Sequence, residues 1–197
     1  MTLAAVLLAG GESRRMGRDK STLTVDGIPL WRRQLDLLRR LAPAELLVSA
    51  RYEPHWLPAD ARFVADAAPG HSPLGGLAAA LEGTRCSHLL ALAIDQPAMT
   101  ASHLAALWRA AAPRCGVLPW LDGRAEPLPA IYPVEAAPGA ATLLAGPDLS
   151  LRTFADALAD AGSMKRHIIG SPDAKLYANC NTPADWRRHV THAEIHD

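Results

Sequence analysis

The first chemically suggestive stretch lies near the N-terminus, where a short apolar run ends in a glycine pair and a basic segment. It reads Leu8-Ala-Gly-Gly-Glu-Ser-Arg-Arg-Met-Gly-Arg-Asp-Lys20. Glycines let the backbone approach a ligand and turn several N–H groups toward an anion. Arg14, Arg15 and Lys20 add positive charge, which favours a triphosphate over the alternative of a plain turn with solvated arginines. The spacing matches neither a Walker A loop nor a G-x-G-x-x-G dinucleotide motif.

Two acidic residues stand directly after predicted strands. Asp95 follows the apolar run 88–94, and Asp66 follows the run 62–65. Open α/β sheets bind ligands at the carboxyl ends of their strands. Magnesium favours one or two carboxylates together with phosphate oxygens and water. Asp95 is therefore a predicted magnesium ligand, and the alternative is an aspartate that caps a turn before Pro97.

Alternating strands and helices are predicted to position these residues. Apolar runs bounded by turn residues predict strands at 3–9, 46–49, 62–65, 88–94, 116–120, 128–132, 168–169 and 176–179. Apolar periodicity predicts helices at 29–41, 77–82, 100–112, 133–144, 151–161 and 183–192, with a loop at 69–76. The alternation implies right-handed βαβ units, and the Asp122-Gly123 turn implies an antiparallel pair. The prediction is an α/β fold: a single three-layer, Rossmann-like domain over 1–197, with a mostly parallel central sheet and an antiparallel addition.

The composition is that of an ordinary globular protein. Hydrophobic residues make up 49%, charged residues 20%, and the formal net charge is +0. The arginines are spread along the chain, so no nucleic-acid partner is expected. No apolar run approaches the ~18 residues that cross a bilayer, and the N-terminal run lacks the basic start of a signal peptide. Three widely spaced cysteines argue against a disulfide framework, so we expect a cytoplasmic protein without membrane contact.

The N-terminal loop resembles the signature loop of the MobA-like nucleotidyltransferases, specifically the molybdenum cofactor guanylyltransferases. Further family motifs follow in the family's order: Gly27-Ile-Pro-Leu30, Ser72-Pro-Leu-Gly-Gly76, Asp95-Gln-Pro97, Glu126-Pro-Leu128 and Asn179-Cys-Asn-Thr-Pro183. The Gly10-Gly11 and Asp19-Lys20 pairs favour the guanylyl branch over the cytidylyl branch. The resemblance implies transfer of GMP from Mg-GTP to the terminal phosphate of molybdenum-bearing molybdopterin, which yields the guanine dinucleotide cofactor and pyrophosphate.

The resemblance also implies roles for individual residues. Nucleotide contacts are implied for Leu8, Ala9, Gly10, Gly11, Lys20, Ser49, Asp66 and Asp95. Catalytic roles are implied for Arg15, Lys20 and Asp95, with Mg²⁺ held by Asp95. Asn179 and Asn181 match the pair that lines the pterin side. Transient contact with the molybdenum-insertion protein and apo-molybdoenzymes is implied as well.

Some residues depart from the family or suggest other functions. Ser49 stands where the family often has an asparagine, so this nucleotide contact depends on the shorter reach of a hydroxyl. Pro129 is a second departure and receives no role. Cys180 is interpreted as a packing residue and not a nucleophile, and the histidines near the C-terminus as a solvated tail and not a metal site: His189, His192 and His196.

Three other functions remain open from the sequence. Two are enzymatic, namely a cytidylyltransferase of the same cofactor and a sugar-phosphate nucleotidyltransferase, and the Asp19-Lys20 pair disfavours both. The third is a non-catalytic module that delivers the finished cofactor. A pure carrier needs no metal ligand, so Lys20 and Asp95 together argue against that function.

Overall fold

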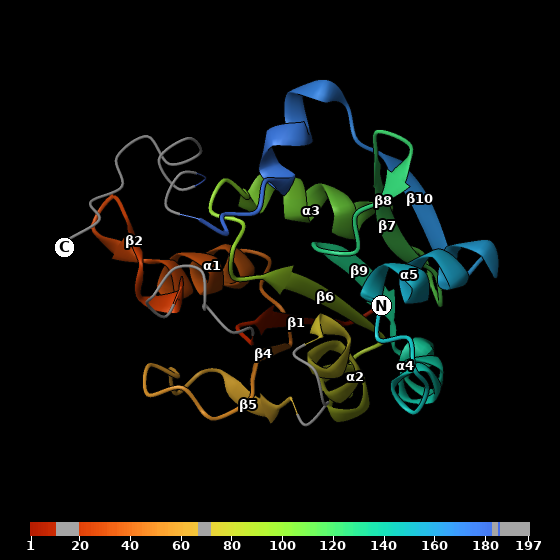
Figure 1. The fold of residues 1–197 in the computed structure, drawn as a ribbon, viewed down its shortest axis with the longest axis horizontal. Coiled ribbons are helices and arrows are strands. Elements are labelled where there is room, and N and C mark those ends of the chain that lie inside the picture. Colours follow the sequence, from red (N-terminus) through yellow and green to blue (C-terminus); the bar gives the residue numbers. More distant parts are fainter. Residues whose placement is uncertain (11–19, 67–71, 183–184, 186–197) are drawn as a thin grey trace.

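A twisted mixed sheet occupies the centre of the computed structural model (Figure 1), which describes residues 1–10, 20–66, 72–182 and 185. Its strands are β1 (Leu3–Leu8), β4 (Glu45–Ala50), β5 (Arg62–Ala65), β6 (His88–Ala93), β7 (Gly116–Leu121), β8 (Arg124–Ala125), β9 (Ala130–Pro133) and β10 (Met164–Ile168). They lie in the order β10-β7-β9-β6-β1-β4-β5, with β8 paired to β7. A separate antiparallel pair joins β2 (Thr24–Val25) to β3 (Ile28–Pro29).

Most of the sheet is parallel, as predicted. β1 pairs in parallel with β4 and β6, β4 with β5, and β10 with β7. β9 runs antiparallel between β6 and β7, and Asp122 and Gly123 form the positive-φ turn from β7 to β8. The antiparallel addition is therefore confirmed. The carboxyl ends of β5, β4, β1 and β6 meet at one edge of the sheet.

Helices cover both faces of the sheet. α1 (Leu30–Arg39) and α3 (Ala101–Ala110) pack on one face, and α2 (Pro73–Gly83), α4 (Ala137–Leu144) and α5 (Leu151–Asp160) on the other. Successive β1 side chains alternate between the two resulting cores, because side chains in a strand point to opposite faces. Short 3-10 helices lie at η1 (Lys20–Thr22), η2 (Val134–Ala136) and η3 (Ser171–Tyr177). The three-layer α/β prediction is confirmed.

Several predicted boundaries were wrong. The segment 72–76 is not a loop: the Ser72 hydroxyl caps α2 by accepting a hydrogen bond from the Leu74 N–H at 3.2 Å, and Pro73 begins the helix. The predicted strand 176–179 is wrong because Leu176 and Tyr177 enter the core from η3. The strand predicted at 168–169 begins earlier, at Met164, and the helix predicted from 133 divides into η2 and α4. Apart from Asp185, the predicted helix 183–192 lies outside the described residues.

The three cysteines form no disulfide, as expected. Cys86 and Cys180 are buried, and Cys180 belongs to the core beneath α1 and α3, which agrees with a packing role. Within the described ranges, no helix is both long and apolar enough to cross a membrane.

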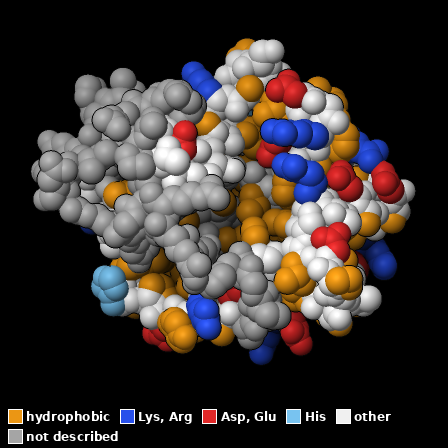
Figure 2. Space-filling view, viewed as in Figure 1, with side chains coloured by type: hydrophobic (Ala, Val, Ile, Leu, Met, Phe, Trp, Pro, Cys, Tyr) orange, Lys and Arg blue, Asp and Glu red, His pale blue; other side chains and the backbone are white. Residues whose placement is uncertain are grey.

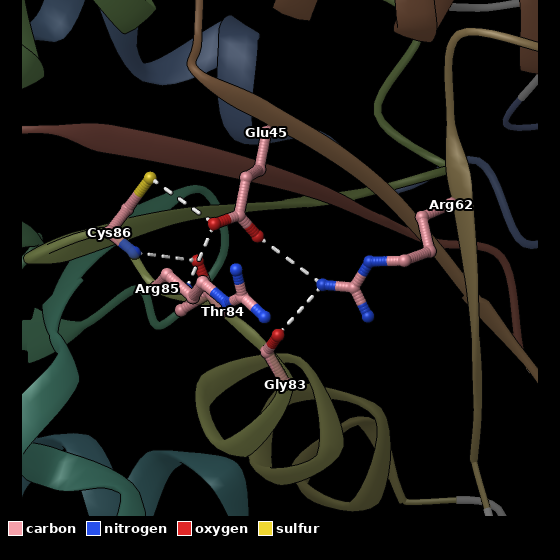
Figure 3. A network of polar contacts seen from close by, with 6 residues as sticks. All are labelled: Glu45, Arg62, Gly83, Thr84, Arg85 and Cys86. Atoms are coloured by element: carbon pink, nitrogen blue, oxygen red, sulfur yellow. Dashed lines mark hydrogen bonds and ion pairs between the residues drawn. The ribbon is translucent and has the colours of Figure 1, made fainter.

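A polar network ties β4, β5 and the end of α2 together at the amino edge of the sheet (Figure 3). The Glu45 carboxylate accepts hydrogen bonds from the Arg85 N–H at 2.9 Å and from Arg62 Nη2 at 3.3 Å. Arg62 Nη2 also donates to the Gly83 carbonyl at 2.7 Å. Burial by itself raises the pKa of Glu45, but these donors and Thr84 outweigh it and hold the pKa below its ordinary value.

This network predicts a measurable acid sensitivity. A carboxyl group whose folded-state pKa is lowered stabilises the fold above its unfolded pKa, and the contribution is lost as pH falls through the folded pKa. Glu45→Gln should therefore lower the free energy of unfolding by about 1 kcal/mol at pH 7. The difference from wild type should shrink as the pH is lowered below about 4.5. Urea unfolding from pH 7 to pH 3 measures this, with the exposed Glu82→Gln as control. A difference that does not change with pH would contradict the assignment.

Candidate active site

The register of the sheet brings the ends of four strands to one level. Leu8 lies opposite Ser49 on β4 and Ala93 on β6. Beyond these pairs, the Ala9 N–H donates to the Ser49 carbonyl at 2.8 Å and the Asp66 N–H to the Ala50 carbonyl at 2.9 Å. Residues far apart in the sequence are thus assembled where ligands bind in open α/β sheets.

A narrow cleft opens at this edge. It is lined by Leu8, Gly10, Ser49, Asp66, Ser72, Pro73 and Gly76. Four of these were predicted as nucleotide contacts, and the structure places them together. The other three belong to the N-cap and the start of α2, in the motif 72–76 whose backbone groups could read a purine edge. The sequence carried a signal for a close contact here, because glycine inside a helix often marks a place where another backbone or side chain approaches closely.

Two glycines allow close contacts across the cleft. A Cβ on Gly76 would lie 2.7 Å from Ser49 Oγ, and a Cβ on Gly10 would lie 3.5 Å from Asp66 Oδ2. Ser49 is only 1% exposed, and its hydroxyl has no hydrogen-bond partner in the described part of the chain. A buried polar group without a partner costs about 1–3 kcal/mol. A ligand with a polar group that reaches Ser49 would therefore gain a hydrogen bond that the protein alone does not make.

An open depression of about 500 Å³ lies on the other side of Gly10. Its lining includes Ala9, Gly10, Ser21 and the loop 50–56. Trp56 Nε1 donates to Ser21 Oγ at 3.1 Å, which fixes η1 against this loop. Lys20 begins η1, and the next residue of η1, Ser21, lines this depression together with Gly10. The Lys20 side chain, Gly11 and Arg15 lie outside the described residues.

The segment that contains the predicted pterin-side residues is hydrogen-bonded to the main chain of the predicted metal ligand. The Cys180 N–H donates to the Asp95 carbonyl at 2.8 Å. Asn179 and Asn181 flank the buried Cys180 and are both exposed. After Cys180, the N–H of Asn181 donates a hydrogen bond to the Asp185 carboxylate at 3.2 Å. The sequence suggested no contact between these two motifs, which are far apart in the chain.

A third segment, around Leu128, borders the residue after Asp95, and Arg152 of α5, for which the sequence predicted no role, contacts the chain just before it. Gln96 Nε2 donates to the Leu128 carbonyl at 2.8 Å, next to the cis peptide bond that precedes Pro129. Nearby, Arg152 Nε donates to the Ala125 carbonyl at 3.0 Å. Figure 2 shows Lys and Arg side chains gathered over the region of β7 and β8, beside a hollow floored by hydrophobic side chains. The motif 126–128 was the one sequence signal in this region.

Comparison with known proteins decides the family. Residues 5–162 match the MobA-like NTP transferase domain. The chain belongs to this family. It is 35% identical over 192 residues to a probable molybdenum cofactor guanylyltransferase of Opitutus terrae, covering 94% of each chain. It is 33% identical over 202 residues to the molybdenum cofactor guanylyltransferase of Cereibacter sphaeroides, covering 95% of each. The protein is therefore a nucleotidyltransferase, as the loop predicted.

Solved structures show that the fold is shared with other nucleotidyltransferases. The molybdopterin-guanine dinucleotide biosynthesis protein A of Archaeoglobus fulgidus superposes with a TM-score of 0.75 at 21% identity, over 95% of this chain and 97% of that one. A Mycobacterium tuberculosis protein in complex with manganese superposes with a TM-score of 0.67 at 18% identity, over 98% and 100%. MobA-like transferases generally use a divalent metal ion.

The residues of this MobA-like transferase fit such an ion. Asp95 follows the buried strand β6 at the carboxyl edge and is partly exposed. In the described ranges, no three His, Cys, Asp or Glu side chains lie close enough to form a metal site by themselves. A hard cation held by one carboxylate and completed by phosphate oxygens and water needs no such cluster. Asp95 stays the residue predicted to provide that carboxylate.

The contact between α2 and β4 predicts the effect of enlarging Gly76. In Gly76→Ala the new methyl group meets Ser49 Oγ and narrows the cleft, so GTP affinity should fall by roughly tenfold or more. Unfolding stability should fall by about 1–3 kcal/mol despite the better helix propensity of alanine. Adding Ser49→Ala removes the overlapping oxygen and should restore stability but not affinity. Thermal unfolding and GTP titration measure both effects.

The matched control is Gly83→Ala at the other end of α2. A Cβ there meets the flexible guanidinium of Arg62 at 3.4 Å. Its GTP affinity should equal that of wild type. Unchanged GTP binding in Gly76→Ala would show that the nucleotide does not enter this cleft.

Proposed function

We propose that this enzyme transfers GMP from Mg-GTP to the terminal phosphate of molybdenum-bearing molybdopterin, with molybdopterin guanine dinucleotide cofactor and pyrophosphate as products. The contact between the Cys180 N–H and the Asp95 carbonyl carries the proposal. It brings the segment with the two exposed asparagines, which we propose to hold the acceptor, next to the main chain of the residue proposed to hold the metal. The names of the guanylyltransferase relatives support the same reaction.

The nucleotide side of the proposal uses the cleft and the glycine loop. The main chain of 8–11 contacts the nucleotide, and Ser49 and Asp66 contact the base and ribose. The cleft supports these roles, because it gathers Leu8, Gly10, Ser49 and Asp66 around one space. The cations of the loop, Arg15 and Lys20, contact the phosphates.

The chemistry is an in-line phosphoryl-type substitution. An oxygen of the acceptor phosphate forms a bond to the α-phosphorus of GTP, and the bond from that phosphorus to the α–β bridging oxygen breaks. Pyrophosphate leaves with the electron pair, and no side-chain nucleophile is required. Arg15 and Lys20 stabilise the charge that builds on the leaving group, and the two asparagines hold the acceptor. Mg²⁺ on Asp95 would supply further charge stabilisation at the triphosphate.

The proposed setting is the cytoplasm, which the reduced state of the three cysteines supports. We also propose transient contact with the molybdenum-insertion protein and apo-molybdoenzymes, because the substrate and the product must each be passed between proteins. Both proposals follow from the reaction and not from a described surface.

Base preference separates the proposed reaction from cytidylyl transfer. The polar groups around the cleft are expected to pair with guanine, and mismatched polar groups would stay unpaired with cytosine. GTP should therefore bind roughly a hundredfold more tightly than CTP or ATP. A competition titration with a fluorescent GTP analogue measures the preference. Equal competition by CTP would exclude the guanylyl assignment and leave only the nucleotidyltransferase family.

Substitution of the proposed metal ligand tests catalysis. Asp95→Asn keeps the shape of the side chain but removes the charge that a hard cation requires, so turnover should fall by roughly two orders of magnitude or more. Nucleotide binding without metal should persist in part. Turnover is measured against Mg²⁺ concentration, with Asp122→Asn in the exposed β7–β8 turn as control. A wild-type magnesium profile in Asp95→Asn would place the metal elsewhere and leave Asp95 as a turn residue.

The same assay tests the non-catalytic alternative. An absence of turnover in the wild-type protein with GTP and the pterin would favour a delivery module.

A further inference from the structure

Four consecutive main-chain carbonyls around Asp95 each accept a hydrogen bond from another element. The carbonyl of Asp95 itself accepts from the Cys180 N–H at 2.8 Å. The carbonyls of Ile94 and Gln96 both accept from Gln34 Nε2, at 3.4 Å and 2.8 Å. The Pro97 carbonyl accepts from Arg33 Nε at 3.2 Å. Two neighbouring residues of α1 therefore hold the main chain on both sides of Asp95.

Gln34 is unusual for its position on α1. It is 0% exposed and lies on the face of the helix that packs into the core, beside Leu30, Leu35 and Leu38. Its Nε2 faces the two carbonyls, while its Oε1 has no donor in the part of the chain that the structure describes. An apolar side chain would fill this position without burying an amide, which costs stability unless it is fully hydrogen-bonded. The benefit of the amide is its pair of bonds to the segment that contains Asp95.

We propose that Gln34, assisted by Arg33, is a positioning residue that directs the Asp95 carboxylate toward the metal. The proposal rests on the proposed function, in which Asp95 is the metal ligand. The peptide planes before and after Asp95 set the direction of its Cα–Cβ bond. Gln34 restrains the plane before Asp95 through the Ile94 carbonyl and the plane after Gln96 through the Gln96 carbonyl. The Cys180 N–H holds the plane between them through the Asp95 carbonyl, so the carboxylate direction is set before metal and nucleotide bind. Groups that orient a metal ligand in this way commonly change metal affinity or activity by 10- to 100-fold when removed.

The test replaces Gln34 by methionine, which has similar length and no donor. Binding of Mn²⁺ to the protein with a non-hydrolysable GTP analogue is measured by electron paramagnetic resonance, and the Mg²⁺ concentration for half-maximal turnover is measured in parallel. Gln34→Met should weaken Mn²⁺ binding by about tenfold or more and raise the Mg²⁺ requirement by a similar factor. Binding of the analogue in excess chelator should be unchanged, because the cleft is intact.

The matched control is His88→Leu at the other end of β6. His88 is also 0% exposed, and its Nε2 lies 3.0 Å from the Ala112 carbonyl, far from the carboxyl edge. This variant removes a buried hydrogen bond from the same strand and should keep wild-type Mn²⁺ affinity. A general loss of stability would affect both variants, whereas loss of positioning affects only Gln34→Met.

Two further variants make the outcome decisive. If Gln34→Met does not fold, Arg33→Ala at the partly exposed contact should weaken Mn²⁺ binding by about threefold. Mn²⁺ affinity within the error of wild type, in Gln34→Met or in Arg33→Ala as its substitute, would overturn the proposal.

Asp95→Asn is measured alongside these variants to separate the two proposals. If it keeps wild-type Mn²⁺ affinity, the proposed function itself fails. If it loses affinity and Gln34→Met does not, only the positioning proposal fails.

Discussion

The double burial of β1 is the constraint on which the rest of the structure depends. All six of its residues are buried, and its two faces supply side chains to separate cores beneath α1 and α3 and beneath α2, α4 and α5. A strand buried on both faces must pair on both edges, because its main-chain groups have no water to bond. Its pairing with β4 and β6 then sets Leu8 level with Ser49 and Ala93. The chemistry at the carboxyl edge follows from this alignment.

The amino edge and the carboxyl edge of the sheet have different roles. At the amino edge, Glu45 gathers donors from Arg62 and Arg85 and joins two strands to the end of α2. At the carboxyl edge, Ser49 keeps a buried hydroxyl without a partner in the described chain, and Gly76 leaves room beside it. The Glu45 carboxylate is thus paired at the edge that holds strands and helix together, whereas the Ser49 hydroxyl is left available at the edge where a ligand is expected. This is the usual division between a scaffold and its site.

The segment that carries Asp95 is held by three parts of the chain. α1 contributes Gln34 and Arg33, the segment after η3 contributes the Cys180 N–H, and Gln96 reaches the Leu128 carbonyl before β9. Because its main chain is held in this way, the segment loses little conformational freedom when a ligand binds, so less of the binding free energy is spent on ordering it. The proposed acceptor side, at Asn179 and Asn181, is joined to this segment by the same Cys180 N–H.

The sequence by itself determined the parts whose signals are local. The apolar runs of β1 and β6 and the acidic residues after strands predicted the parallel sheet and the positions of Asp66 and Asp95 at its carboxyl edge. Local pattern failed at Ser72–Gly76, predicted as a loop, because Gly76 lies within α2 and faces Ser49 on β4, not a turn. Only the tertiary structure decided that Gln34 and Cys180 hold the Asp95 segment. Hydrogen bonds between a buried amide or N–H and a distant main-chain carbonyl depend on how the helices pack on the sheet. Sequence periodicity indicates which face of a helix is buried, but it does not indicate which residues that face contacts.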